Sequence, residues 1–196
     1  MIGLTGSIGM GKSETAKLFA AEGIPVHDAD AAIAQLYGKG GAAVAVIARE
    51  FPGAVQDGAV DRAILSALVV NDDAALKKLE ALVHPLVAAE RDAFLQHAQA
   101  PIVLFDVPLL FETGADAEAD AIVVTSAPEA VQRARVLARP GMTMEKFESL
   151  KARQLGDREK RQQAHYVVMT DKGLDHAHEQ VKMILADIRN RLAAFA

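Results

Sequence analysis

Residues 3–14 of this chain have the sequence GLTGSIGMGKSE, with four glycines among the first nine positions. Glycine loses more chain entropy on folding than any other residue, so this density indicates a backbone that must approach another group closely. Gly6 to Ser13 match the pattern G-x-x-x-x-G-K-[S/T] of a phosphate-binding loop. The match is specific when it lies between a strand and a helix, and both are predicted here, at Ile2–Thr5 and at Lys12–Ala21.

The residue types of this loop suit the chemistry of a nucleoside triphosphate. Glycines allow backbone conformations that a β-carbon excludes, and successive amides at the helix N-terminus then point at phosphate oxygens. Lys12 supplies a positive charge for the β- and γ-phosphates, and the hydroxyl of Ser13 can bind Mg²⁺. A glycine-rich turn without a ligand is the alternative, but the complete match in a strand–helix setting favours a triphosphate site.

Short apolar runs alternate with longer helical patterns along the rest of the chain, which is typical of βαβ units and a parallel sheet. Further strands are predicted at four brief runs rich in Val, Ile, Leu or Phe, as in strands buried on both faces: Ile24–His27, Ile102–Phe105, Ala121–Thr125 and Tyr166–Met169. The expected fold class is α/β, a P-loop NTPase fold with a five-stranded parallel sheet flanked by helices. The 196 residues fit a single domain with a helical insert at about 38–100 and a charge-dense insert at about 138–165.

Several helix boundaries can be predicted from capping residues. Asp28 is a possible N-cap for a helix over 29–37, and Asn71 for a helix that begins with two acidic residues. That second helix is expected to break near His84-Pro85, because proline cannot occupy a helix interior without loss. Ser126 and Glu129 have the spacing of a capping box. The terminal helix is expected to bury one face through the residues Ala177, Val181, Ile184, Ile188, Leu192 and Phe195.

Composition excludes several classes of protein. The net charge of −5 at pH 7 gives no support for a general nucleic-acid binder, and the absence of cysteine excludes disulfides, zinc–thiolate sites and thiol catalysis. No apolar run is long enough to cross a bilayer. The first predicted strand begins directly after Met1, which leaves no room for a targeting segment, so a cytoplasmic location is expected.

A triphosphate site alone is compatible with a kinase, a switch GTPase or a motor. No asparagine begins an N-K-x-D guanine motif and no aspartate begins a D-x-x-G switch motif, and the chain is short for a motor, so a small-molecule kinase remains. The stretch VHDAD, residues 26–30, places two carboxylates after the second predicted strand, at the edge where ligands of α/β sheets bind. Either carboxylate can accept a proton from an attacking hydroxyl or help to hold the metal, although Asp28 also suits a helix cap. Spacing leaves the choice between Asp28 and Asp30 open.

Four segments in this order resemble the dephospho-coenzyme A kinase family: LTGSIGMGKS, VHDADAAIA, HPL at 84–86 and DVPLLFE at 106–112. The downstream ARQLGDREKRQQAHYVV is similar to that family's lid and last strand, so the resemblance covers nearly the whole chain. HPL followed by DVPLLFE is the specific part, because P-loops are common to many families. The resemblance implies transfer of the γ-phosphoryl group of ATP to the ribose 3′-hydroxyl of dephospho-CoA, the last step of coenzyme A synthesis.

The resemblance also implies roles for individual residues. Asp30 matches the family's proposed catalytic carboxylate, and the insert with Lys77, Lys78 and His84 corresponds to its CoA-binding region, while residues near 135–160 correspond to the mobile lid. The segment that corresponds to its ATP-binding residues comprises Gly9, Met10, Gly11, Lys12, Ser13 and Glu14. This chain departs from the family's usual residues at three positions: Glu14 replaces a frequent threonine, and His165 and Thr170 replace Asp and Asn.

Three further residues, Asp106, Leu109 and Arg139, are candidates for the site, and each also has an ordinary structural explanation. Asp106, at the end of a predicted strand, can hold Mg²⁺ through water or bond to adjoining loop amides, and the metal role is slightly favoured. Leu109 belongs to an apolar stretch that is expected to form a wall of the substrate site. Arg139 shares a helical face with Gln132 and Arg135, a pattern more usual on a solvated surface. Because Arg139 precedes the natural hinge Pro140-Gly141, it is the favoured lid cation for the transition state, alongside Lys12.

The expected ligands are therefore ATP, Mg²⁺ and dephospho-CoA, with no nucleic-acid or membrane partner, for a chain that is a monomer or a weak homo-oligomer. A shikimate- or nucleotide-type kinase is the nearest alternative, because shikimate kinases also place D-x-D after the second strand. Their R-x-x-E and triple-glycine elements are absent here. A regulator that senses ATP without turnover is the alternative from another class, and the paired aspartates and lid-like insert argue against it.

Overall fold

The computed structural model describes residues 1–194; Phe195 and Ala196 lie outside the described part of the chain. Contacts between residues divide the chain into two compact units. The first unit comprises Met1–Val26 and Ala100–Ala196, and the second comprises His27–Gln99.

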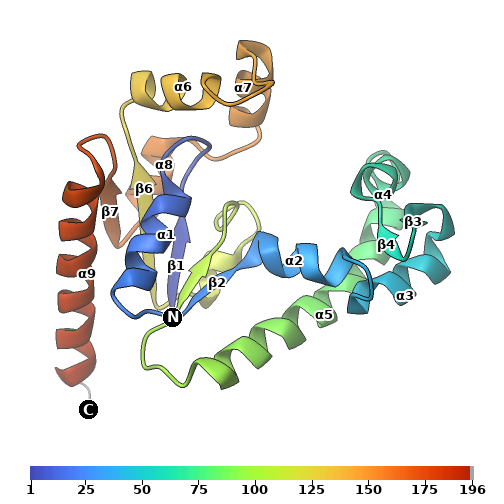
Figure 1. Cartoon of the computed structure of the whole chain (residues 1–196), viewed down its shortest axis with the longest axis horizontal. Helices are drawn as coiled ribbons and strands as arrows, with labels where there is room; N and C mark the ends of the chain where they lie inside the picture. The colour runs from blue at the N-terminus through green and yellow to red at the C-terminus, as the bar shows by residue number, and fades with distance from the viewer. Residues whose placement is uncertain (195–196) are drawn as a thin grey trace. The chain divides into compact units, whose positions relative to one another are not determined.

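A five-stranded sheet has the strand order β2-β5-β1-β6-β7 (Figure 1), and all its strands except the end of β2 belong to the first unit. The strands are β1 (Ile2–Thr5), β2 (Val26–Asp28), β5 (Leu104–Asp106), β6 (Ala121–Ser126) and β7 (Tyr166–Met169). The strand β1 pairs in parallel with β5 and β6, and β6 pairs in parallel with β7. The predicted five-stranded parallel sheet flanked by helices is confirmed. The predicted ranges of β1 and β7 match the structure, whereas β2 and β5 begin two residues later than expected.

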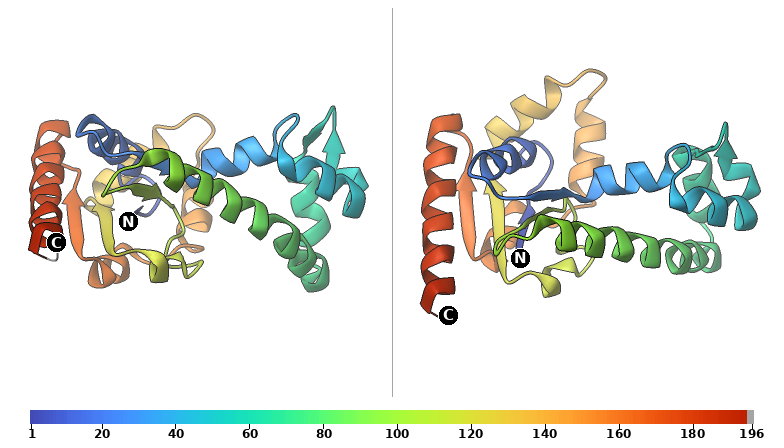
Figure 2. Two further views of the ribbon diagram at one scale, coloured as in Figure 1. Left: turned by 90° about the horizontal axis from the view of Figure 1, so that it is seen from below. Right: turned by 60° about the horizontal axis from the view of Figure 1, so that its bottom comes forward.

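The two faces of this sheet are covered by different parts of the chain. Side chains alternate along a strand, so Ile2 and Leu4 point to the same face, where they join an apolar core with α1 (Lys12–Ala21) and α9 (Leu174–Ala194). Figure 2 shows α9 running beside β7. Gly3 points to the other face, where a β-carbon would lie 3.0 Å from Cδ2 of Leu110. The segment after β5 therefore packs closely on that face.

The remaining helices of the first unit are η2 (Ala115–Glu118), α6 (Glu129–Leu137), α7 (Met144–Lys151) and α8 (Asp157–Gln163). The predicted capping box at the start of α6 is wrong. Ser126 still belongs to β6, where its hydroxyl donates to Asp157 at 3.0 Å, and Pro128 occupies the N-cap position.

The terminal helix α9 buries part of the predicted face. Its buried residues are Ala177, Val181, Ile184 and Leu185. Leu192 is 45% exposed, and Phe195, the last residue of the predicted face, lies outside the described residues. The apolar face is therefore buried toward the start of α9 and more exposed toward its end.

The second unit is mainly helical and has an apolar core of its own, which includes Ile47, Leu65 and Val83. Its elements after β2 are α2 (Ala29–Tyr37), α3 (Ala42–Glu50), η1 (Pro52–Ala54), β3 (Val55–Gln56), β4 (Ala59–Val60), α4 (Arg62–Val69) and α5 (Asp73–Ala98). The hairpin β3–β4 was not predicted. Its turn residues Asp57 and Gly58 both have positive φ, 51° and 80°. Asp-Gly is the turn sequence that such a hairpin favours, so a signal was present in the sequence.

The predicted break of the long helix at His84-Pro85 is wrong, because α5 is continuous from Asp73 to Ala98 with Pro85 inside it. An interior proline removes one backbone hydrogen bond and costs about 3 kcal/mol. Residues on both sides of the proline, Leu79 and Val83 before it and Leu86 after it, pack into the core of the second unit. This packing offsets the local loss, which periodicity and propensity alone do not include.

Capping of the helices in the second unit is partly as predicted. Asp28 caps α2, because its carboxylate accepts a hydrogen bond from the N–H of Ala31 at 2.9 Å. The cap of α5 is Asp72 rather than Asn71. The carboxylate of Asp72 accepts hydrogen bonds from two first-turn amides, both at 3.0 Å.

Candidate active site

The glycine loop lies between β1 and α1, as its motif predicts, and its shape depends on the absence of side chains. Gly9 and Gly11 have φ values of 79° and 88°, in the left-handed region that favours glycine. A β-carbon at Gly9 would lie 2.5 Å from Cγ2 of Val136, and one at Gly6 would lie 2.1 Å from Oγ1 of Thr125. The loop therefore packs directly against α6 and the end of β6.

Replacing Gly6 by alanine is expected to lower the free energy of unfolding by about 1–3 kcal/mol, because the new methyl group overlaps Thr125. Urea denaturation monitored by circular dichroism measures the effect. Gly53→Ala is the matched control, because its β-carbon would meet no atom within 4 Å. Equal unfolding midpoints for the two variants would contradict the predicted close packing.

Hydrogen bonds from α6 and from the loop after β7 hold the carbonyl side of the glycine loop. Gln132 donates to the carbonyl of Ile8 at 2.8 Å, and Thr170 donates to that of Met10 at 3.0 Å. Arg135 donates to the carbonyl of Gly9 at 3.4 Å and to Oγ1 of Thr170 at 2.8 Å. The first-turn amides of α1 have no acceptor within the helix and carry the positive end of its dipole. The loop thus offers an anion site made of backbone N–H groups.

The lysine of the loop meets a carboxylate at the end of the neighbouring strand. The ammonium group of Lys12 forms a hydrogen-bonded ion pair with Asp106, the last residue of β5. The side chain of Asp106 is 6% exposed and that of Lys12 is 16% exposed. A cation and a buried carboxylate therefore lie together at the carboxyl edge of the sheet, where ligands of α/β folds bind.

A cavity of about 380 Å³ adjoins the glycine loop. The residues that line it include Gly9, Gly11, Glu14, Arg135, Arg139, Thr170 and Asp171. Leu18 and Leu174 add apolar surface, and the volume lies in the usual range for small-molecule sites. Asp171 lines this cavity, and one of its carboxylate oxygens is buried without a hydrogen-bond partner among the described residues.

The structure places most of the site residues expected from the sequence in the first unit. Those that belong to the first unit are Gly9, Met10, Gly11, Lys12, Ser13, Glu14, Asp106, Leu109 and Arg139. The side chain of Met10 is only 2% exposed and accepts a hydrogen bond at its sulfur from the N–H of Ala127, so only its backbone is available to a ligand. Leu109, after β5, is 39% exposed.

Asp30, Lys77 and His84 lie in the second unit. Asp28 is engaged as the cap of α2, whereas Asp30 is exposed in the first turn of this helix and bonds to no described side chain. Lys77 and His84 are exposed and seven positions apart on α5, which places them on one helical face. Lys78, by contrast, forms an ion pair with Glu50 at 2.5 Å.

The helical face of Gln132, Arg135 and Arg139 is not a solvated surface throughout. Gln132 is 2% exposed beneath the loop, Arg135 is half-buried, and only Arg139 is exposed, beside the cavity. The sequence showed the spacing of these residues, but burial depends on the position of α6 against the loop.

A buried ion pair supports the segment between α7 and α8. The side chain of Lys160 is fully buried and contacts Glu112 at 2.9 Å. Burial raises the pKa of Glu112, but hydrogen bonds from Lys160 and from the N–H of Leu155 outweigh it and hold the pKa below its ordinary value. Glu112 is therefore an anion at neutral pH. No feature of the sequence indicated that Lys160 is buried or that Gln154 lies beside this pair.

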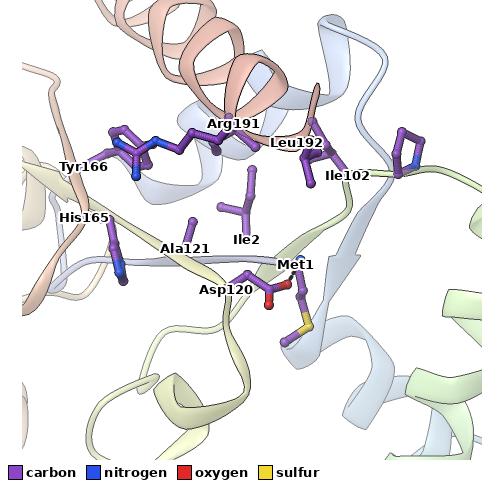
Figure 3. A pocket seen from close by; sticks show the side chains of 11 residues that line it. Met1, Ile2, Ile102, Asp120, Ala121, His165, Tyr166, Arg191 and Leu192 are labelled. Atoms are coloured by element: carbon purple, nitrogen blue, oxygen red, sulfur yellow. Dashed lines mark hydrogen bonds and ion pairs between the residues drawn. The ribbon is translucent and has the colours of Figure 1, made fainter. Parts of the chain in front are cut away.

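A second cavity, of about 420 Å³, lies at the opposite edge of the sheet (Figure 3). Ile2, Ala121 and Tyr166 line it, and each begins or lies at the amino end of a strand. Its polar groups already have partners: the hydroxyl of Tyr166 and the guanidinium of Arg191 both bond to Asp187. Because this cavity lies at the amino ends of the strands and the glycine loop follows the carboxyl end of β1, the cavity is not part of the site around the loop.

A parallel sheet with a glycine loop after β1, and a lysine–aspartate pair at the carboxyl edge, define a P-loop nucleotide-binding protein. The family described as "Dephospho-CoA kinase" matches residues 1–176 of the chain. Dephospho-CoA kinase from Rhodopseudomonas palustris (strain BisB18) is 53% identical over 189 residues, 95% of this chain and 94% of that protein. The protein of the same name from Cereibacter sphaeroides is 54% identical over 188 residues, 96% and 95% of the two chains. The crystal structure of TT1252 from Thermus thermophilus has a TM-score of 0.84 at 36% identity and covers 95% of this chain and 96% of that one. The chain belongs to the dephospho-CoA kinase family, as its motifs predicted.

Proposed function

We propose that this chain transfers the γ-phosphoryl group of ATP to the ribose 3′-hydroxyl of dephospho-CoA, which yields coenzyme A and ADP. The observation that carries the proposal is the contact of Lys12 with Asp106 beside a glycine loop with two left-handed glycines, in a member of this family. Phosphoryl transfer needs few covalent partners from the protein, so positioning and neutralisation of charge account for most of the catalysis.

ATP would bind with its phosphates on the amides of the glycine loop and its nucleoside in the adjoining cavity. Lys12 leaves Asp106 to bind the β- and γ-phosphates, because a phosphate is the more highly charged partner. Arg139, exposed beside the cavity, is the lid cation that neutralises charge in the transition state. Asp171, which lines the cavity, supplies a carboxylate acceptor for an amino or hydroxyl group of the nucleoside.

The residues beside the loop also suit Mg²⁺. Mg²⁺ is usually bound by one or two protein groups together with phosphates and water. The hydroxyl of Ser13, in the first turn of α1, and the carboxylate of Asp106 are the groups that would hold it. When bound, Mg²⁺ neutralises charge on the phosphate oxygens.

Residues of the second unit are proposed to bind the acceptor. Asp30 orients or deprotonates the 3′-hydroxyl, which is supported by its exposed carboxylate and by the engagement of Asp28 as a cap. Lys77 and His84, on one exposed face of α5, offer positive charge and hydrogen bonds to the phosphates of dephospho-CoA. Leu109 provides an apolar contact. In this assignment, the insert at about 38–100 binds the acceptor, and the segment at about 138–165 is the lid.

The test offers ATP and Mg²⁺ together with dephospho-CoA, shikimate or AMP in parallel, and identifies the phosphorylated product by mass spectrometry. We expect dephospho-CoA to be the only one of the three acceptors that is phosphorylated, with ADP and coenzyme A formed in equal amounts. Phosphorylation of shikimate or AMP, without phosphorylation of dephospho-CoA, would contradict the proposal that dephospho-CoA is the acceptor. Binding of ATP without release of ADP under any of these conditions would identify a nucleotide-binding regulator instead.

We also propose that the chain is located in the cytoplasm and that it is a monomer or a weak homo-oligomer. Among the described residues, no single helix has the length and apolarity to cross a membrane, although Ala29–Tyr37 and Ala42–Glu50, bent by 62°, meet these criteria as a pair. Sedimentation equilibrium over a range of concentrations measures the oligomeric state.

A further inference from the structure

We propose that Gln154 is a positioning residue for phosphoryl transfer, which holds the end of the glycine loop that receives the γ-phosphate. Gln154 is half-buried in the connection between α7 and α8. Its amide oxygen accepts a hydrogen bond from the N–H of Ile8 at 2.9 Å. The inference rests on the proposed function, because it assigns a part of the same site.

The peptide groups of Ile8 are held by two glutamines from different parts of the chain. Gln132, buried in α6, donates to the carbonyl of Ile8 at 2.8 Å, and Gln154 accepts from its N–H. One bond comes from a regular helix, and the other comes from a connecting segment. Removal of Gln154 would leave the carbonyl held while the N–H loses its partner, so this end of the loop could shift.

The position of the cavity indicates which end of the triphosphate Gln154 borders. Gly9, Gly11 and Glu14 line the cavity proposed for the nucleoside, whereas Ile8 does not. A nucleoside in this cavity places the α-phosphate nearest to it and the γ-phosphate farthest from it along the loop. Gln154 therefore borders the γ-phosphate end, which ADP leaves empty.

Contacts of the adjacent Leu155 hold the backbone beside Gln154 in place. The hydroxyl of Ser7 donates to the carbonyl of the adjacent Leu155 at 3.4 Å, and the N–H of Leu155 donates to Glu112 at 2.8 Å. Glu112 in turn bonds to the fully buried Lys160 at 2.9 Å. The ion pair thus fixes the backbone beside Gln154, and Gln154 connects this segment to the loop.

Replacing Gln154 by methionine keeps the length of the side chain and removes the amide. We expect kcat to fall by about 10- to 100-fold, because small displacements of reacting groups have effects of this size. The dissociation constant of ADP is expected to stay close to the wild-type value, because ADP has no γ-phosphate. Asn190→Met, which removes an exposed amide from α9 outside the lid, is the matched control and should retain wild-type kcat.

A second variant, Gln154→Glu, retains an acceptor oxygen for the N–H of Ile8 but adds a negative charge at the γ-phosphate end. This variant should raise the KM for ATP by about 10-fold or more, since like charges at short range repel strongly. Its dissociation constant for ADP should change much less. The ratio of the change in the KM for ATP to the change in the dissociation constant of ADP measures how near residue 154 lies to the terminal phosphate.

The measurements are steady-state kcat and KM with dephospho-CoA, titration calorimetry with ADP, and the melting temperature of each variant. Wild-type kcat in Gln154→Met would overturn the inference. Equal loss of ATP and ADP binding, together with a lower melting temperature, would also overturn it by showing a purely structural role. A wild-type chain that does not phosphorylate dephospho-CoA would instead contradict the proposed function.

Discussion

Replacing Lys12 by methionine is expected to lower kcat by about 10²–10³-fold, the usual effect of removing one group that stabilises transition-state charge. Methionine preserves the aliphatic stem of the side chain, so the packing around the loop changes little. The ammonium group is lost from the place where the β- and γ-phosphates bind, and Asp106 loses the cation that it contacts. A loss of kcat with a folded protein is the expected result.

Lys17→Met is the matched control for this variant. Lys17 lies on the same helix, its side chain is 71% exposed, and it forms an ion pair with Glu14 at 2.7 Å. Exposed pairs of this kind contribute about 0–1 kcal/mol to stability, so both folding and kcat should remain close to the wild-type values. Steady-state rates at saturating ATP and dephospho-CoA, with thermal melting as the folding control, measure both variants. If Lys12→Met kept wild-type kcat, the proposed phosphate site would be wrong.

The second large effect is expected for Asp30→Asn, which should lower kcat by about 10²-fold or more, the range typical of a lost general base. Asparagine has nearly the same shape as aspartate but cannot accept the proton of the 3′-hydroxyl. The affinity for ATP should persist, because the glycine loop belongs to the other unit. Single-turnover rates and titration calorimetry with ATP separate the two properties.

Asp28→Asn serves as the matched control, because it makes the same chemical change two positions away. Asparagine is as good an N-cap as aspartate, so the bond to the N–H of Ala31 can be retained and α2 should remain intact. We expect turnover close to that of the wild type. Unchanged turnover in Asp30→Asn would remove Asp30 from the mechanism, and a large loss confined to Asp28→Asn would transfer the role to Asp28.

Local features of the fold could be predicted because their causes are local. The runs of apolar residues at Ile2–Thr5 and Tyr166–Met169 form strands with these bounds, and Asp28 caps the helix that follows it. The interior of α5 could not be predicted in this way. The loss at Pro85 is local, whereas the compensating contacts join α5 to residues such as Ile47 and Leu65 from other helices of its unit.

The candidate site shows the same division. The glycine loop, Lys12 and Asp106 are recognisable from motifs, because each motif is a short run of residues. The two glutamines that hold Ile8 are 124 and 146 positions away from it in sequence. A glutamine in a polar segment is ordinarily exposed, so no pattern in the sequence marks either of them as a partner of the loop.

By itself, the sequence determined the class of fold, the phosphate-binding loop and the family, because these depend on periodicity, backbone freedom and short motifs. Only the tertiary structure decided that Lys12 contacts Asp106, that Gln132 lies beneath the loop, and that Lys160 is buried with Glu112. The physical reason is that burial and hydrogen-bond partners are properties of distant segments brought together. They depend on how the elements pack, and no single stretch of the chain contains that information.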